Sequence, residues 1–187
     1  MATREVEHRV APVGRSLRFL SDEALARRFA DGENAAFEVL FDRYRSPVHR
    51  FCRALMRSTE DAEEVFQTAM TDAHRALRSS PGERLVIRPW FYRAAREAGI
   101  ALIAGRRPMD DVIDRQTPVD ARALLEMGPE VQRLLAELHT LSEPQRAALL
   151  LCEMSGLPPA SVAEAMAMSR SEARRLVFEA RRSLSAS

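Results

Sequence analysis

The residues with the clearest chemistry in this sequence are arginines near its C-terminal end. At 100° per residue, one side of a helix over 169–184 carries Arg170, Arg174, Arg175, Arg181 and Arg182. The opposite side carries the apolar residues Ala173, Leu176, Val177, Ala180 and Leu184. Because guanidinium groups bind phosphate oxygens and guanine edges, the arginine face has the chemistry of a DNA-binding helix. A solvated amphipathic helix that ends a small bundle is the alternative interpretation.

A second short helix is expected directly before this one. Ser161 with Glu164, and Ser169 with Glu172, have the S-x-x-E spacing of a capping box, which marks the starts of both helices. Two short helices, the second with a basic outer face, predict a helix-turn-helix unit whose second helix enters the major groove. The candidate DNA-binding residues on that helix are Arg170, Ser171, Arg174, Arg175, Phe178 and Arg182. Phe178 points outward, where it could contact a thymine methyl group or pack on a neighbouring helix.

Basic and aromatic residues also alternate near the middle of the chain. The segment SSPGERLVIRP has turn signals and two arginines, and it directly precedes Trp90, Phe91 and Tyr92. Bases of a single strand stack on aromatic rings while arginines follow the backbone, so this segment is a candidate single-stranded DNA surface. Aromatic residues in such a pattern are alternatively core residues. The candidate residues are Arg84, Arg88, Trp90, Tyr92, Arg93 and Arg96.

The elements that must position these residues are all expected to be helices. Apolar residues recur with helical spacing throughout, and the alternation of a strand is absent from the sequence, so we expect an all-α fold. The expected helices cover 21–31, 33–57 with Pro47 bending or dividing it, 60–78, 88–105, 129–140, 143–155, 159–167 and 169–184. In the helix over 60–78, the apolar stripe leaves Asp61, Glu64, Gln67, Thr68 and Thr71 facing outward.

The charge distribution divides the chain into two domains. Residues 108–128 hold two prolines and two arginines against five acids, and they lack a sustained periodicity, which predicts an acidic linker. We therefore expect an N-terminal extension over 1–20, a basic helical domain over 21–107, and a helix-turn-helix domain over 129–187. Fully extended at ~3.3 Å per residue, the linker could span about 70 Å. Because the second domain has fewer than about 60 residues, we expect it to be stabilised by a partner.

The composition argues against several classes of protein. Cys52 and Cys152 lie in separate apolar segments, so we expect neither a disulfide framework nor a metal site. The N-terminal residues lack the apolar core of a signal peptide, and no apolar run reaches the ~18 residues of a membrane span, which predicts a cytoplasmic protein. We expect no enzyme and no cofactor, because the sequence has neither a Ser/His/Asp order nor a glycine-rich phosphate loop. The four histidines are scattered, and we interpret them as structural or solvated.

Four segments, in this order, resemble the extracytoplasmic-function sigma factors of bacterial RNA polymerase. DAEEVFQTAM, from Asp61, resembles the family's D-A-E-D-hydrophobic-x-Q helix, and GENAAFEVLFDRY, from Gly32, resembles G-D-x-x-A-F-x-x-L-Y-x-R-Y. RPWFYRAAR, from Arg88, is similar to W-L-Y-R-I-A-R. The segment from Leu141 to Ser169 resembles L-P-x-x-x-R-x-x-L-L-x-x-x-x-G-L-x-x-x-E-I-A-x-x-L-G-I-S. The resemblance covers residues 21–107 and 129–184.

The resemblance implies a dissociable subunit that binds core RNA polymerase and promoter DNA. The first domain would grip the polymerase and open the downstream promoter element, the linker would follow the path of nascent RNA, and the second domain would read the upstream element. The residues that the resemblance places on the polymerase are Asp61, Glu64, Gln67 and Thr68. An anti-sigma factor is a further candidate partner.

This sequence also departs from the family pattern. Glu97 and Ala101 replace the usual Asn and Asp of the helix over 88–105, and Glu97 would repel a DNA strand. In the last helix Glu172, Leu176 and Glu179 replace Thr, Arg and Arg, and Glu179 falls on the flank away from the five arginines. These departures leave open a sigma mimic that binds an anti-sigma factor or polymerase without reading promoters. The third hypothesis is a stand-alone dimeric repressor. It is disfavoured because the segment DAEEVFQ, which resembles a polymerase-binding helix, would then have no purpose.

Overall fold

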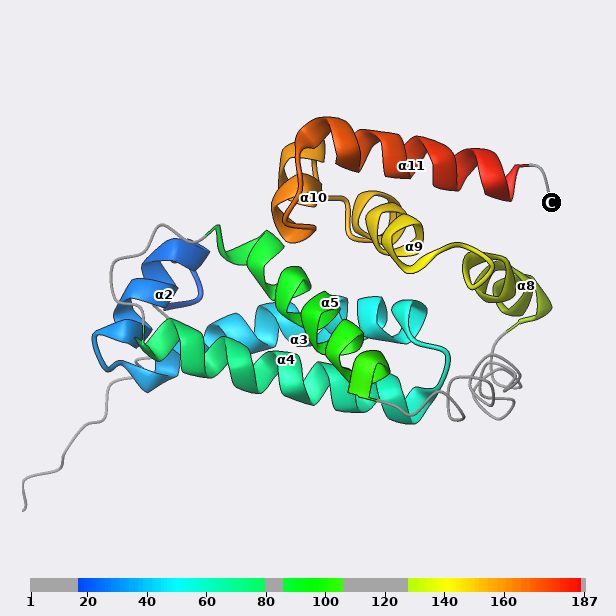
Figure 1. The fold of residues 1–187 in the computed structure, drawn as a ribbon. Coiled ribbons are helices and arrows are strands. Elements are labelled where there is room, and N and C mark those ends of the chain that lie inside the picture. The colour runs from blue at the N-terminus through cyan, green and yellow to red at the C-terminus, as the bar shows by residue number, and fades with distance from the viewer. Residues whose placement is uncertain (1–16, 80–85, 106–127, 186–187) are drawn as a thin grey trace, which may run out of the picture.

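The structure, a computed structural model, describes residues 17–79, 86–105 and 128–185. Every regular element in these described residues is helical, as the sequence predicts (Figure 1). The bounds of the helices lie within a few residues of the expected ones. The prediction of an all-α fold is therefore confirmed.

The first half of the structure contains four packed helices. They are α2 (Asp22–Ala30), α3 (Asn34–Leu55), α4 (Thr59–Ser79) and α5 (Ile87–Gly105). Pro47 lies inside α3, which continues through it as one helix. The core is apolar and contains fully buried aromatic rings, among them Phe29, Phe51 and Phe91. Burial of these rings supplies much of the hydrophobic free energy that holds the four helices together.

The second half contains shorter helices around its own apolar residues. They are α8 (Pro129–Leu138), α9 (Glu143–Leu149), the π-helical turn η1 (Leu150–Met154), α10 (Pro159–Ala165) and α11 (Arg170–Leu184). The single helix expected over 143–155 therefore changes from α to π geometry at Leu150. Gly156 follows with a φ of 60°, a left-handed conformation that glycine adopts without a steric penalty.

One of the two expected capping boxes is wrong. α10 begins at Pro159 with Pro158 as its N-cap, so Ser161 lies inside the helix and caps nothing at its start. Proline is favoured in the first turn of a helix because its fixed φ is helical and its missing N–H is not needed there. A capping box that the sequence analysis missed starts α9, where Ser142 and Gln145 bond to one another.

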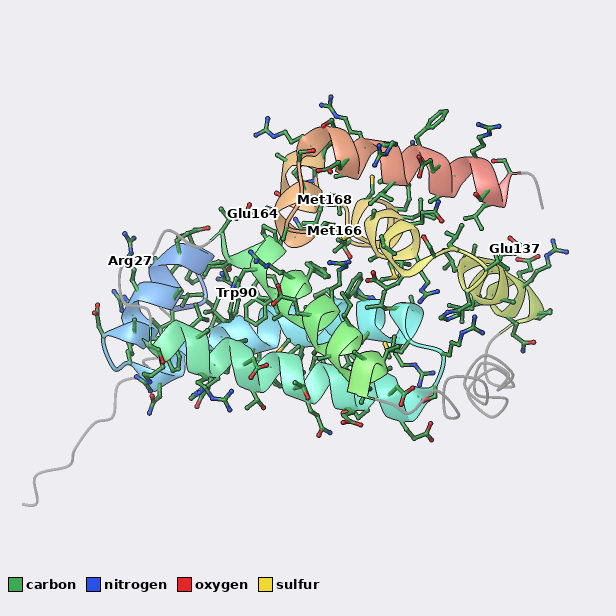
Figure 2. The ribbon with its side chains drawn as sticks, viewed as in Figure 1. Arg27, Trp90, Glu137, Glu164, Met166 and Met168 are labelled. Carbon is green, nitrogen blue, oxygen red and sulfur yellow. The ribbon has the colours of Figure 1, made fainter. Side chains whose placement is uncertain are left out.

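The two halves pack against one another. α10 lies against α5, while α9 and η1 contact α3 (Figure 1). Figure 2 shows Met166 and Met168 at the end of α10, and Met166 is buried. The expected stabilising partner of the small second domain is, in this arrangement, the first domain of the same chain.

Candidate nucleic-acid and partner interfaces

The start of α11 is fixed by the capping box that its sequence predicts. The Glu172 N–H donates to the Ser169 hydroxyl over 3.3 Å, and the Ser169 N–H donates to the Glu172 carboxylate over 2.9 Å. The hydrogen bonds from Ser169 also lower the pKa of Glu172 below its usual value. The capping box thus explains why Glu172 departs from the family pattern. It also stabilises the N-terminal end of α11, which is the end that would enter the major groove of DNA.

The predicted DNA-binding face of α11 is exposed to solvent. Ala173 and Ala180 pack inward, whereas the candidate residues Arg170, Ser171, Arg174, Arg175, Phe178 and Arg182 are all exposed. Figure 2 shows nitrogen-tipped side chains projecting from α11 away from the rest of the molecule. Phe178 is 67% exposed, and it lines a cavity of about 210 Å³ with Val162 and Val177. The face therefore combines cations with one apolar ring.

Two expectations about this face are corrected by the structure. Glu179 lies beside an arginine rather than away from all five, because its Oε1 is 3.7 Å from the Arg175 Nε one turn earlier. Arg181 turns back toward η1, where it forms an ion pair with Glu153. Fewer arginines of α11 are therefore available to bind a ligand than the spacing of 100° per residue predicts.

The predicted polymerase-binding face of α4 is exposed at three of its four residues. Glu64, Gln67 and Thr68 face solvent, and Gln67 donates to Glu63 over 3.2 Å. Hydrogen bonds from Gln67 and His49 lower the pKa of Glu63, so this carboxylate stays charged. The prediction of an outward Asp61 is wrong, because Asp61 is only 7% exposed at the start of α4. Its N–H donates to the Ser58 hydroxyl, so its backbone belongs to the first turn of the helix.

A groove between α4 and α5 continues this face. It has a volume of about 590 Å³, and its polar lining residues are Glu64, Thr68, Asp72 and Glu97. Trp90, which Figure 2 labels, lines the same groove with Val65 and Leu102. The groove therefore has an apolar base and a rim that carries three carboxylates. Glu97 and Asp72 are two residues of this surface that the sequence analysis did not assign to it.

The predicted single-strand surface on α5 is only partly exposed. Tyr92 is 2% exposed and packs edge-on against Phe51, so it is a core residue and offers no stacking surface in this arrangement. Trp90 is half-buried, and Arg93 pairs with Glu97 over 2.9 Å. Arg84 lies outside the described residues. The core interpretation of the aromatic residues is thus correct for Tyr92 and Phe91.

The arginines of α5 make contacts that the sequence could not indicate. Arg96 donates from its Nε to the Glu143 carboxylate over 2.8 Å and from a terminal nitrogen over 2.9 Å. Arg88 donates to the backbone oxygen of Ser155 over 2.6 Å. Both acceptors belong to the second half of the chain. Glu143 and Ser155 therefore accept hydrogen bonds from arginines of the predicted strand-binding surface, although no sequence motif marks these two residues.

The described residues contain no group of three or more potential metal ligands. Burial raises the pKa of the Cys52 thiol to about 12, so this side chain is neutral and packs as an apolar residue. None of the described helices is both long enough and apolar enough to cross a membrane.

Two protein-family models match the chain in the order of its two halves. The model described as Sigma-70 region 2 matches residues 40–107, and Sigma-70, region 4 matches residues 131–184. The second match contains α9, α10 and α11, and the first contains α4, α5 and the groove between them. The matches thus coincide with the two surfaces described above.

Characterised relatives are similar over most of their length. The chain is 30% identical over 176 residues to the ECF RNA polymerase sigma-E factor of Haemophilus influenzae, covering 87% of this chain and 92% of the relative. It is 30% identical over 151 residues to the ECF RNA polymerase sigma factor SigM of Mycobacterium tuberculosis, covering 80% of this chain and 75% of the relative.

Solved structures share the fold. CnrH in complex with the cytosolic domain of CnrY aligns with a TM-score of 0.68 at 23% identity, over 88% of this chain and 95% of that one. The sigma factor RpoE of Bartonella quintana, solved with the anti-sigma factor NepR, aligns with a TM-score of 0.63 at 18% identity, over 79% and 93% of the two chains.

Proposed function

The chain belongs to the extracytoplasmic-function sigma factors of bacterial RNA polymerase. On this basis we propose which of its surfaces bind the polymerase and which bind promoter DNA. The protein binds core RNA polymerase and directs transcription initiation at promoters. The domain over 21–107 binds the polymerase and the downstream promoter element, and the domain over 129–187 reads the upstream element. The segment over 108–128 links the two. This is a binding function rather than a catalytic one, and it is carried out in the cytoplasm.

The polymerase contact is formed by α4 and extends into the groove. Glu64, Gln67 and Thr68 are exposed together on one side of the helix, and Glu64 and Thr68 also line the groove. The carboxylate rim of that groove favours a basic partner, and Trp90 in its apolar base favours a partner with an apolar side chain. We assign Glu97 to this contact, because it lies on the same rim as Glu64. Asp61 supports the start of α4 from inside.

Promoter reading is assigned to the exposed arginines of α11. The observation that carries this assignment is the capped, outward-facing helix with Arg174 and Arg175 in solvent. Arg88, Arg93 and Arg96 of α5, with Arg84 before it, are the candidate contacts to the unpaired strand. A sigma mimic that reads no promoter would not need an exposed arginine face. This face therefore favours the interpretation of the chain as a sigma factor that reads promoters. An anti-sigma factor is a candidate regulator, as RpoE of Bartonella quintana was solved with one.

The polymerase contact can be tested on α4 itself. We expect Glu64→Arg with Thr68→Arg to abolish co-purification with core polymerase, because the double variant places two cations on the carboxylate rim. Glu130→Arg, a change to an exposed acid on α8, is the matched control. Circular dichroism checks that the helix content of all three proteins is the same. Retention of full core binding by the double variant would overturn the assignment of this face.

A further inference from the structure

A cavity of about 210 Å³ lies beside the predicted DNA-binding face, where α10 packs against α11 (Figure 1). Three elements form its walls, with Cys152 from η1, Val162 from α10 and Val177 from α11. Val162 is buried, and the other two are half-buried. Phe178, which is 67% exposed, forms a further wall, so the cavity opens to the surface. These walls favour an apolar occupant, because its burial removes apolar surface from water.

The charged groups that line this cavity are two arginines of α11, Arg174 and Arg181. Arg181 forms an ion pair with Glu153, which compensates its charge. Arg174 is exposed and has neither an ion-pair partner nor a hydrogen-bond partner among the described residues. The cavity therefore has one uncompensated guanidinium group at its opening. The planar fork of such a group matches the two oxygens of a carboxylate.

An apolar cavity with one uncompensated guanidinium group matches a small apolar monocarboxylate. The carboxylate accepts two parallel hydrogen bonds from Arg174, and the hydrocarbon part packs against Val162 and Val177. A dianion would have one charge without a partner, and a neutral molecule would cover Arg174 without accepting its hydrogen bonds. The volume is below the ~300–1,000 Å³ of sites for drug-sized ligands, so the acid that fits is a small one.

We propose that this cavity binds a small apolar monocarboxylate through Arg174, and that the bound acid prevents α11 from reading promoter DNA. Arg174 and Phe178 belong both to the cavity and to the assigned DNA-binding face. The same guanidinium group cannot bind the acid and DNA at once, so the acid is a competitive inhibitor of promoter reading. Binding of the acid follows from the cavity alone, whereas its effect on transcription rests on the proposed function of α11.

Octanoate is a suitable probe, because it joins one carboxylate to an unbranched apolar chain. Isothermal titration calorimetry on the full-length chain should show one saturable site for octanoate. Binding of 1-octanol, which lacks the charge, should be at least about tenfold weaker, and Arg174→Gln should weaken octanoate binding to a similar extent. Octanoate that does not saturate one site, or that binds Arg174→Gln as tightly as the wild type, would overturn the proposal.

Cys152→Leu tests whether the acid enters the cavity. The larger side chain takes up part of the cavity volume, so it should weaken octanoate binding, and Cys152 is not a residue assigned to DNA or polymerase. Met154→Leu is the matched control, because Met154 is exposed on the same π-helical turn and does not line the cavity. Equal octanoate binding by the wild type and a folded Cys152→Leu variant would place the acid outside the cavity and overturn the site.

Methyl NMR of the wild type locates the bound acid without any substitution. Octanoate should shift the methyl signals of Val162 and Val177, which line the cavity. The methyl signals of Val131, an exposed valine of α8, should stay unchanged. Shifts at Val131 as large as those at Val162, or no shift at Val162, would also overturn the site.

A promoter-binding experiment tests the inhibition separately. Fluorescence anisotropy measures the affinity of the assembled holoenzyme for a promoter duplex in octanoate at ten times its dissociation constant, with equal acetate as the control for ionic strength. Octanoate should weaken promoter binding by up to about tenfold, and it should have less effect on Cys152→Leu. Unchanged promoter binding with the cavity occupied would overturn the inhibition. A holoenzyme that binds no promoter even in acetate would instead refute the proposed function of α11, whereas calorimetry and NMR alone decide the acid site.

Discussion

Glu97 and Arg93 form an ion pair along α5, with 2.9 Å between the Glu97 Oε1 and the Arg93 Nε. The pair places the acid on the rim of the groove between α4 and α5, beside Glu64. The sequence alone suggested that Glu97 would repel a DNA strand from this helix. Because it lines the groove with Glu64, we propose instead that Glu97 belongs to a carboxylate surface for a basic partner.

We therefore predict that Glu97→Arg weakens binding to core polymerase by about tenfold, because it places like charges against a basic partner. Competition for core polymerase against a labelled sigma factor would measure the affinity, with Glu130→Arg as the control. If Glu97→Arg instead left core affinity unchanged and strengthened binding to a pre-melted promoter, Glu97 would face the strand after all.

The ion pair between Arg175 and Glu179 predicts a second effect on DNA binding. Glu179→Gln should tighten binding to all DNA sequences alike by about threefold, because it removes a negative charge beside a phosphate-binding cation. Arg174→Ala should act differently if Arg174 reads a base, with a loss of ~1–3 kcal/mol at a single promoter position. Binding to a set of single-base promoter variants separates the two outcomes. Equal affinities of both variants and wild type for every DNA would contradict the assignment of α11.

The turn before α11 contains a strained residue. Ala167 has a φ of 53°, in the left-handed region where a side chain is disfavoured and where the family pattern has glycine. Ala167→Gly should raise the free energy of unfolding by about 0.5–1 kcal/mol, because the relief of strain exceeds the added entropy of the unfolded chain. Ala136→Gly, at an exposed position of α8, should lower it by about 1 kcal/mol. Urea unfolding measures both, and destabilisation by Ala167→Gly would refute the strain.

His139 predicts how the stability depends on pH. Burial, together with the charges of Arg146 and Arg57, lowers the pKa of His139 to about 3. Since its unfolded pKa is about 6.5, only the unfolded chain takes up this proton between pH 6.5 and 3. The contribution of neutral His139 is therefore complete above about pH 6.5 and is lost as the pH falls, by up to about 1.4 kcal/mol per unit.

Urea unfolding of the wild type and His139→Leu between pH 7 and 4 would measure this contribution. The groups that face His139 include Arg57 from the turn before α4 and Arg146 from α9, and Glu143 lies close to Arg146. Comparison with His139→Leu removes the effect of the carboxylates that titrate in the same range. If the free energies of unfolding of the two proteins changed with pH in parallel, His139 would take up its proton as readily in the folded state as in the unfolded state, which would contradict the prediction.

The local features of the fold could be predicted from the sequence, because they depend on neighbours within a few residues. The periodicity of apolar residues located every described helix, and the spacing of Ser169 and Glu172 located the start of α11. The same spacing failed at Ser161, where Pro158 and Pro159 determine the start instead. Local rules thus compete, and the backbone restriction of proline prevailed over a side-chain cap.

The contacts between the domains could not be predicted, because no local pattern connects Arg96 with Glu143. Helical periodicity identifies which side of a helix is apolar, but it does not say whether the polar side meets solvent or another domain. The same gap explains Asp61, whose polar side chain is enclosed at the start of α4, and Tyr92, which packs on Phe51. The exposed α11 face was predictable because nothing in the described residues covers it.

The central claim, that this chain directs polymerase to promoters through α4 and α11, has one direct measurement. Purified protein is added to sigma-free core polymerase with genomic DNA of its own host, and the 5′ ends of the transcripts are sequenced. We predict starts at a discrete set of sites that share an upstream and a downstream element and that disappear with Glu64→Arg/Thr68→Arg. Starts no more specific than those of core polymerase alone would contradict the claim.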